Sequence, residues 1–217
     1  LEISMKIVAI VQARMGSKRL PGKVMELIGG TAAIEVLIRR LSRSQTISQI
    51  VLATSNDMRN KPLKEIAETL GVECFLGSEE DVLTRYLQAA EKYHADVVVR
   101  VTGDCPLIDA GLLDTMVQEF KKDNVDYLAN TMPPTFPDGL DLEIFTKIAL
   151  KKSSTMTKSP YDREHVTPYI RNSGKFKTKN YENKPDLSRY RWTLDELTDL
   201  DVIRKIFSYF APNIYFT

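Results

Sequence analysis

The segment Ile7–Met25, with the sequence IVAIVQARMGSKRLPGKVM, decides the fold of this 217-residue chain. Its first five residues, Ile7 to Val11, form an apolar run of the kind found in strands that helices cover on both faces. A loop rich in glycine and basic residues follows. In open α/β sheets, ligands bind just beyond the carboxyl ends of the strands. The segment therefore predicts a buried parallel strand followed by a binding loop.

The loop concentrates positive charge. Four basic residues and two glycines lie close together, namely Arg14, Lys18, Arg19, Lys23, Gly16 and Gly22. Cationic side chains and mobile backbone amides suit a polyanion such as a triphosphate. The spacing excludes both common phosphate motifs, because the loop contains neither G-x-G-x-x-G nor a glycine-rich run ending in G-K-S/T. The alternative is a solvated basic turn, since charge runs usually face water.

Outward from this loop, apolar strands alternate with amphipathic helices through the first 130 residues, which predicts a mostly parallel sheet. Further strands are expected at 50–53 and 97–101, and helices with a 3.6-residue apolar stripe at 34–41, 63–70, 83–90 and 113–120. Pro133, Pro134 and Pro137 then exclude a central strand and predict a loop or a departing lobe. Beyond it we expect helices near 146–154 and 163–172, a strand near 175–181 and a final helix over 203–210.

Composition excludes several classes of partner. Thirty basic and 29 acidic residues give a net charge of +1, so no overall field attracts nucleic acid or anionic lipid. No apolar stretch approaches the ~20 residues of a membrane span. Cys74 and Cys105 suit reduced, buried thiols. We therefore expect a cytoplasmic protein with no nucleic-acid or membrane partner. Leu1–Ser4 precede Met5 and are typical of a cloning remnant or an upstream extension.

Six further segments follow the loop in a recognisable order. They are ATS at 53–55, GSEEDVLTRY at 77–86, RVTGDCPLID at 100–109, FPDGLDLEIF at 136–145, REHVTPYIR at 163–171 and RWTLDE at 191–196. Together with A-R-x-G-S-x-R-L-P-G-K, this series resembles the CMP-KDO and CMP-sialic acid synthetase superfamily of nucleotidyltransferases. The resemblance is strongest to its SpsF-like branch of spore-coat polysaccharide cytidylyltransferases, and it runs from Met5 to about Phe210.

The resemblance implies the fold and the reaction. The implied fold is α/β, a three-layer Rossmann-like sheet of the nucleotide-diphospho-sugar transferase (GT-A-like) type. One domain would span 5–217, with a core of 5–130 and 186–210 and a small sugar-binding and dimerisation lobe at about 131–185. The implied reaction transfers CMP from CTP to a sugar or sugar acid with release of pyrophosphate, in surface or spore-coat polysaccharide biosynthesis. Mg²⁺ is the implied cofactor, and a homodimer is expected.

The resemblance also assigns residues to the nucleotide. The implied catalytic residues are Arg14, Arg19, Lys23 and Asp104. The implied nucleotide-binding residues are Ala13, Arg14, Ser17, Arg19, Lys23, Thr54, Gly77, Ser78 and Arg85. From spacing alone, Gly77 and Ser78 fit a turn with a helix cap at least as well.

Two aspartates are the implied metal ligands. Asp104 follows a predicted buried strand, and Mg²⁺ takes hard oxygen ligands, often only one or two of them from protein. Asp195 aligns with the V-D-T-P-E-D-L segment of the synthetases, although Glu196 and Leu197 replace Thr-Pro here. Local sequence alone leaves two alternatives open. Asp104 would also fit a cap on the helix that starts near Asp109, and Asp195 would fit an ordinary acidic residue near a helix start.

The implied acceptor residues come from two segments and are Asp138, Asp141, Glu143, Arg163, Glu164 and His165. Their carboxylates suit sugar hydroxyls, and the Arg-Glu-His group suits a sugar or its carboxylate. The alternatives are an exposed strand with alternating faces and a histidine that bonds to backbone or solvent.

Two other functions compete with this interpretation. A nucleotide-sugar glycosyltransferase would share the layered build, but such enzymes usually hold their metal with Asp-x-Asp at a strand end. The match here, Asp199-Leu200-Asp201, lies in a predicted helix. The second is a non-catalytic nucleotide-binding subunit, which the retained basic loop and both aspartates disfavour.

Overall fold

The computed structural model describes residues 5–217, so the expectation about Leu1–Ser4 lies outside the described residues. A seven-stranded sheet with the order β5-β4-β1-β6-β8-β7-β9 forms the centre. Its strands are β1 (Ile7–Gln12), β4 (Gln49–Ser55), β5 (Glu73–Gly77), β6 (Val97–Thr102), β7 (Tyr127–Ala129), β8 (Glu143–Thr146) and β9 (Thr178–Asn180). β8 is antiparallel to β6 and β7, and the other neighbours pair in parallel. The mostly parallel sheet is thereby confirmed.

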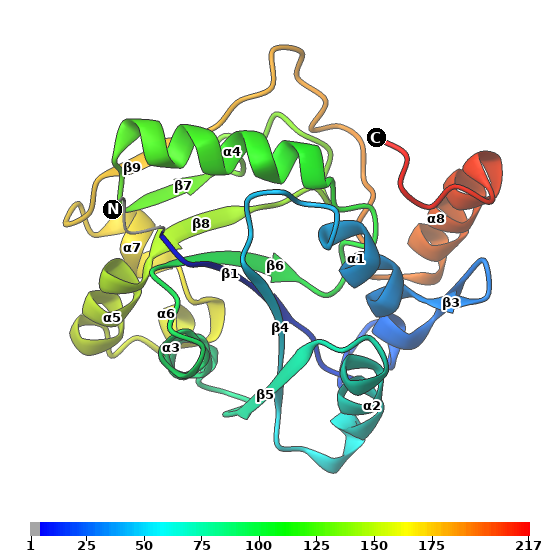
Figure 1. Cartoon of the computed structure of the whole chain (residues 1–217), viewed down its shortest axis with the longest axis horizontal. Coiled ribbons are helices and arrows are strands. Elements are labelled where there is room, and N and C mark those ends of the chain that lie inside the picture. Colours follow the sequence, from blue (N-terminus) through cyan, green and yellow to red (C-terminus); the bar gives the residue numbers. More distant parts are fainter. Residues whose placement is uncertain (1–4) are drawn as a thin grey trace.

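Helices cover both faces of the sheet (Figure 1). They are α1 (Ala33–Leu41), α2 (Lys61–Thr69), α3 (Val82–Lys92), α4 (Ala110–Asp123), α5 (Lys147–Met156), α6 (Pro160–His165), α7 (Pro168–Asn172) and α8 (Leu197–Phe210). Alternate residues of β1 point to opposite layers. Ile7, Ala9 and Val11 join the core with α1, α2 and α4, whereas Val8 and Ile10 join the core with α3, α5 and α7. Burial on both faces explains the apolar run with which the chain begins.

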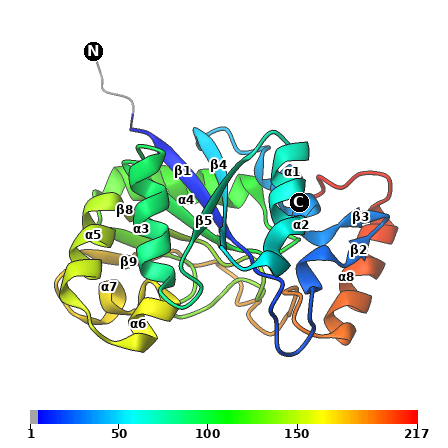
Figure 2. The ribbon, with the colours of Figure 1, turned by 90° about the horizontal axis from the view of Figure 1, so that it is seen from below.

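The remaining elements lie at one end of the sheet. The hairpin β2 (Leu27–Ile28) and β3 (Thr31–Ala32) packs with α1 and α8 into a third apolar cluster. Figure 2 shows this group at the opposite end of the molecule from α5, α6 and α7. Short 3₁₀ turns, η1 (Lys23–Met25) and η2 (Met58–Asn60), precede β2 and α2. Both cysteines are free thiols, and no helix among residues 5–217 is both long and apolar enough to cross a membrane.

The helix predicted over 163–172 is instead two short helices. The chain turns between them at Val166, which has a φ of 72°, and Pro168 begins the second helix. This positive φ is incompatible with a right-handed helix, and Pro168 has no amide hydrogen to continue the helical hydrogen bonds, so one continuous helix is excluded. The strand predicted near 175–181 is shorter, because β9 covers three residues.

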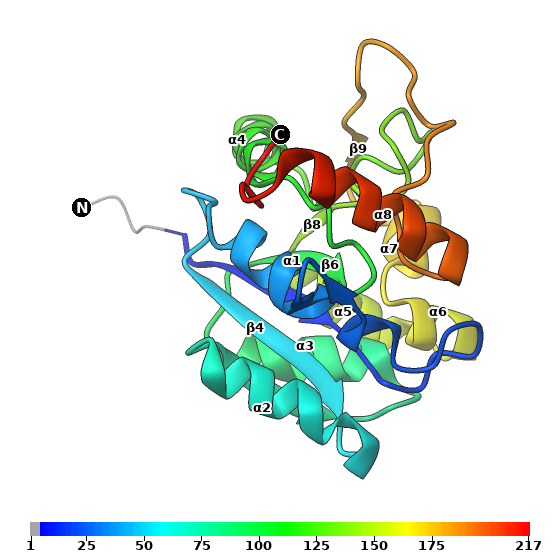
Figure 3. The same cartoon turned by 90° about the vertical axis from the view of Figure 1, so that its right-hand side faces the viewer.

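The segment 131–185 does not stand apart as a lobe. Its strand β8 lies between β6 and β7, with Glu143 opposite Arg100, and β9 extends the same sheet beyond β7. Without β8, the backbone groups of one side of β6 would be unpaired, which explains why the chain returns to the sheet. The proline-rich loop before β8 and the loop after β9 project beyond the layers, as Figure 3 shows for the latter.

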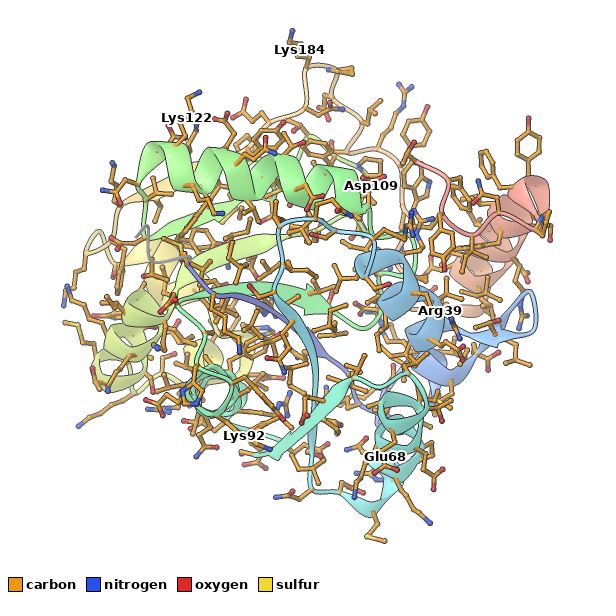
Figure 4. The ribbon with its side chains drawn as sticks, in the orientation of Figure 1. Arg39, Glu68, Lys92, Asp109, Lys122 and Lys184 are labelled. Carbon is orange, nitrogen blue, oxygen red and sulfur yellow. The ribbon has the colours of Figure 1, made fainter. Side chains whose placement is uncertain are left out.

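Two helix starts bear on the alternatives for the two implied metal aspartates. α4 is capped by Asp109, whose side chain accepts a hydrogen bond from the Leu112 amide at 2.8 Å. Figure 4 shows Asp109 at the beginning of this helix. α8 begins with a capping box between Glu196 and Asp199. The Asp104 carboxylate therefore does not cap α4. Asp195 does lie near a helix start, just before the N-cap of α8, although its carboxylate takes no part in that cap.

Candidate active site

The basic loop is held in place by the neighbouring strand ends. The Ala13 amide donates to the Ala53 carbonyl at 3.2 Å, and the Gly103 amide donates to the Gln12 carbonyl at 2.7 Å. A Cβ at position 103 would lie 2.9 Å from the Ala13 Cβ, so only glycine permits this approach. Gly22, with a φ of 73°, closes the loop by donating to the Met15 carbonyl at 3.0 Å. The loop thus lies over the carboxyl ends of β1 and β6.

A cleft of about 440 Å³ lies under this loop. Its lining residues are Gln12, Ala13, Arg14, Ser17, Lys18, Arg19, Lys23, Val24, Thr102, Gly103, Asp104, His165 and Asp195. Eight of the predicted site residues are among them: seven come from the loop and the two aspartate segments, and the eighth is the predicted acceptor residue His165. The structure therefore brings the predicted phosphate and metal groups to one place.

Asp104 and Asp195 converge on a single cation. The Lys23 ammonium lies 2.8 Å from the Asp104 Oδ2 and 2.7 Å from the Asp195 Oδ1, and Arg19 lies 2.8 Å from the same Asp195 oxygen. Burial favours neutral lysine, but the two carboxylates raise the net pKa of Lys23. Burial likewise opposes ionisation of Asp195, yet its bonds with Lys23 and Arg191 hold the pKa of that carboxyl below its ordinary value. The carboxylate oxygens of both aspartates therefore face the same ammonium group.

This arrangement fits the implied metal. Two carboxylates that meet on one ammonium offer hard oxygen donors to any cation placed between them. Among residues 5–217, no three histidine, cysteine or acidic side chains gather into a metal cage. Mg²⁺ tolerates such a sparse set, because it keeps several waters and shares its remaining positions with substrate phosphates.

Four of the predicted nucleotide-binding residues, Thr54, Gly77, Ser78 and Arg85, lie outside the cleft lining, whereas Ala13 lies within it. Thr54 is fully buried in β4, and Arg85 is buried while it donates to the Ser78 carbonyl at 2.6 Å. The Ser78 hydroxyl accepts from the Asp81 amide at 3.0 Å, and a Cβ at Gly77 would lie 2.8 Å from the Arg85 Cγ. These contacts fit the alternative of a turn that leads into α3. Base contact by this turn stays a prediction.

A second pocket, of about 200 Å³, adjoins the cleft. Its lining residues are Arg100, Thr102, Thr131, Asp141, Glu143, Tyr161, His165, Thr167 and Arg171. Thr102 and His165 line both hollows, so the two are contiguous. A ligand in the second pocket would face the phosphate loop across these two side chains.

The second pocket is built from buried, fixed charges. Glu143 pairs with Arg100 and accepts hydrogen bonds from the Tyr127 hydroxyl at 2.6 Å and the Thr167 hydroxyl at 2.5 Å. Burial alone would favour the neutral acid, but Arg100 and these hydroxyls hold the pKa of Glu143 below its ordinary value. Glu143 therefore shapes the pocket wall and has little capacity left for a ligand.

Other polar atoms in this pocket lack partners. The Nε atoms of Arg100 and Arg171 and the Thr131 hydroxyl are buried without a hydrogen-bond partner among the described residues. Burial, together with the nearby charges of Asp138 and Glu143, raises the pKa of Asp141 to about 6. Buried polar groups are normally satisfied, so this cluster indicates a polar ligand.

Three predicted acceptor residues lie elsewhere. Asp138 pairs with Arg191 at 2.5 Å. Arg163 bonds to Asp81 at 2.7 Å and to two backbone carbonyls, and with Glu164 it lines a separate hollow beside α3. The structure does not bring Arg163 or Glu164 to the second pocket.

Sequence reasoning missed Arg100, Arg171, Arg191 and Thr102. Arg100 carried a usable signal, because a charge inside a strand covered on both faces requires a partner. Arg171 and Arg191 had no comparable signal. The competing Asp-x-Asp pattern lies within α8, where Asp199 caps the helix and pairs with Arg191. It is therefore not a metal site at a strand end.

Comparisons with known proteins agree with this geometry. Residues 8–209 match the family model described as cytidylyltransferase. The chain is 32% identical over 209 residues to the spore coat polysaccharide biosynthesis protein SpsF of Bacillus subtilis, covering 93% of this chain and 86% of that protein.

Solved structures give the same result. A cytidylyltransferase from Leptospira borgpetersenii superposes with a TM-score of 0.95 at 40% identity, covering 98% of this chain and 90% of that chain. A CMP:2-keto-3-deoxy-manno-octonic acid synthetase complexed with CTP has a TM-score of 0.68 at 19% identity, covering 94% and 99% of the two chains. The latter similarity establishes the shared fold alone.

Proposed function

The chain belongs to the cytidylyltransferase family, and from this premise we propose that its two contiguous hollows bind CTP and an acidic sugar and join them. CMP would pass from CTP to a sugar hydroxyl, with release of pyrophosphate, in the biosynthesis of a surface or spore-coat polysaccharide. One observation carries the assignment of the hollows. Thr102 and His165 line both, so an acceptor in the second pocket lies directly beside the phosphate loop.

The cleft residues bind and neutralise the triphosphate. The acceptor hydroxyl oxygen attacks the α-phosphorus and gives up its proton to solvent, the bond to the bridging oxygen of the β-phosphate breaks, and pyrophosphate leaves. Arg14, Arg19 and Lys23 supply positive charge where negative charge develops, and the backbone amides of the loop add donors. Lys23 exchanges its two carboxylate partners for phosphate oxygens when the nucleotide binds.

Asp104 and Asp195 would hold Mg²⁺. When bound, this ion supplies charge neutralisation on phosphate oxygens and favours the ionised form of the acceptor hydroxyl. Both aspartates line the cleft, with Asp104 just beyond the carboxyl end of β6, and this is where they would hold the ion.

The acceptor is proposed to be a sugar acid. Arg171 lines the second pocket, and its buried Nε has no partner among the described residues, which suits the carboxylate of the acceptor. Asp141 and Thr131 offer hydrogen bonds to sugar hydroxyls. The homodimer expected from sequence belongs to the proposal as well and is tested by sedimentation.

The test is pyrophosphate release with Mg²⁺, each of the four nucleoside triphosphates and a panel of acidic and neutral sugars. Release should require CTP and an acidic sugar, and Asp104→Ala should lower it by about a hundred- to a thousandfold because a main source of charge stabilisation is lost. Equal release with neutral sugars would refute the acceptor class. Tight CTP binding without any release would refute the reaction.

A further inference from the structure

We propose that Arg191 is a positioning residue that orients Asp195 for metal binding and links it to the loop beside the acceptor pocket. The inference rests on the proposed function, because it takes Asp195 as a metal ligand. Arg191 does not line the cleft, so it acts through Asp195 and not on substrate.

The two oxygens of Asp195 have different partners. Arg191 Nη2 lies 2.7 Å from the Asp195 Oδ2, whereas the Lys23 ammonium lies 2.7 Å from the Oδ1. A carboxylate bonded on one oxygen keeps its plane and side-chain rotamer, and the other oxygen stays directed into the cleft. Partners behind a metal ligand act in this way when they orient it.

Arg191 is itself fixed by two other carboxylates. Its Nε lies 3.1 Å from the Asp199 Oδ1, and its Nη1 lies 2.5 Å from the Asp138 Oδ2. Asp199 is itself held in place, because its other oxygen accepts hydrogen bonds from the Asp195 and Glu196 amides at 2.9 Å in the helix cap. The planar guanidinium thus joins three carboxylates in one arrangement, which a lysine cannot reproduce.

The backbone around Arg191 links both halves of the site. The Asp138 amide donates to the Tyr190 carbonyl at 3.0 Å, and the Trp192 amide donates to the Asp138 carbonyl at 2.6 Å. Further along, the Leu194 amide donates to the Asp104 carbonyl at 2.7 Å. One extended segment is therefore bonded to the loop before β8 and to the first metal aspartate.

A close contact fixes the same segment. Gly139 has a φ of +107°, and a Cβ there would lie 2.6 Å from the Thr193 nitrogen and from the Trp192 carbonyl carbon. The backbones touch without an intervening side chain. Arg191 and this contact together determine where Asp195 lies relative to Asp104.

The experiment measures the affinity of the protein–CTP complex for Mn²⁺, from the electron paramagnetic resonance signal of free Mn²⁺ with protein in excess over CTP. Arg191→Gln should weaken Mn²⁺ binding about tenfold, the lower end of what removing a partner of a metal ligand costs. Arg191→Lys should weaken Mn²⁺ binding by a smaller factor, about threefold, because the lysine ammonium keeps the positive charge but replaces the planar, forked guanidinium. The apparent KM for CTP at saturating metal should stay within about twofold.

The matched control is Arg189→Gln. Arg189 lies two residues away, contacts Tyr190 and has no part in the site, so Mn²⁺ affinity should not change. A purely structural role for Arg191 would lower the melting temperature and leave Mn²⁺ affinity at the wild-type value, which would overturn the proposal. If Arg191→Gln does not fold, unchanged affinity in Arg191→Lys would overturn it equally. Asp195→Ala separates the two ideas, since undiminished Mn²⁺ binding in that variant would refute the metal assignment itself.

Discussion

The loop arginines of the nucleotide cleft and the charges of the second pocket are held in opposite ways. In the nucleotide cleft, Arg14 and Arg19 expose 49% and 58% of their side chains, and they come from one short loop. In the second pocket, Arg100 and Glu143 expose 16% and 8%, and each belongs to a different strand. The two loop arginines are adaptable cations for a flexible polyanion, although Lys23 and Asp195 in the same cleft are buried, whereas the pocket presents a preformed, rigid pattern.

This difference separates binding strength from discrimination. Exposed cations can move to meet phosphate oxygens with little loss of folding free energy. Solvent and salt screen their interactions with other charges. Buried pairs contribute little net stability, but they are costly to break and cannot adapt to a wrong ligand. Changes in the pocket should therefore affect folding and acceptor choice, and changes to the exposed loop cations should affect CTP binding and turnover without affecting folding.

The largest expected effect is on stability. Glu143→Gln leaves the buried Arg100 without its counter-charge and should lower the free energy of unfolding by about 3 kcal/mol. Urea unfolding measures the change. Glu35→Gln, which breaks an exposed pair with Arg39 on α1, is the matched control and should cost less than about 0.5 kcal/mol. Equal losses would show that the pocket charges are no more rigid than those of the surface.

Acceptor binding should respond next. Arg171→Gln removes the proposed carboxylate partner and should raise the acceptor KM about thirtyfold, equivalent to about 2 kcal/mol for a charged hydrogen bond, with the KM for CTP unchanged. Arg163→Gln should lower the melting temperature without changing the acceptor KM, because its donors bond within the protein. A rise in acceptor KM for Arg163→Gln alone would reverse these assignments.

A smaller effect concerns pH. The folded-state pKa of Asp141, about 6, lies above its ordinary value of 3.8, so the folded protein holds this proton more tightly. Protonation of Asp141 therefore stabilises the folded state fully below a pH of about 4, and this contribution is lost as the pH rises through about 6. Asp141→Asn should remove roughly 1 to 2 kcal/mol of pH dependence from the unfolding free energy over this window. Asp201→Asn, at an exposed position, should leave the profile unchanged.

The smallest effects are expected in the loop. Arg19→Gln should raise the KM for CTP about tenfold, or ~1.4 kcal/mol, because one charge-assisted contact is lost. Lys18→Gln, one residue earlier in the same cleft, should change it less than about threefold, in line with a solvated lysine. Neither should alter the unfolding free energy. A larger effect from Lys18→Gln would show that Lys18, and not Arg19, makes the main contact with the triphosphate.

Sequence reasoning succeeded where function is local in the chain. The strand Ile7–Gln12, its loop and the helices up to α4 follow from periodicity and glycine placement within a few residues. The acceptor pocket depends on pairings that no local pattern encodes. Arg100 meets Glu143 because β8 enters the sheet beside β6, and that strand order follows from tertiary packing. Arg163 illustrates the converse, since this polar residue in a suggestive motif bonds to Asp81, the N-cap of the neighbouring helix α3.

The position of β8 also orders the assembly of the chain during synthesis. β1, β4, β5 and β6 pair among themselves, so this half of the sheet is complete in sequence once residue 102 has been made. β7 pairs only with β8 and β9 among the described strands, and both follow it in the chain. Until residue 146 emerges from the ribosome, β6 is an open edge and β7 has no place in the sheet. The nascent protein therefore exposes a strand edge for about forty residues of translation, the kind of surface that chaperones protect.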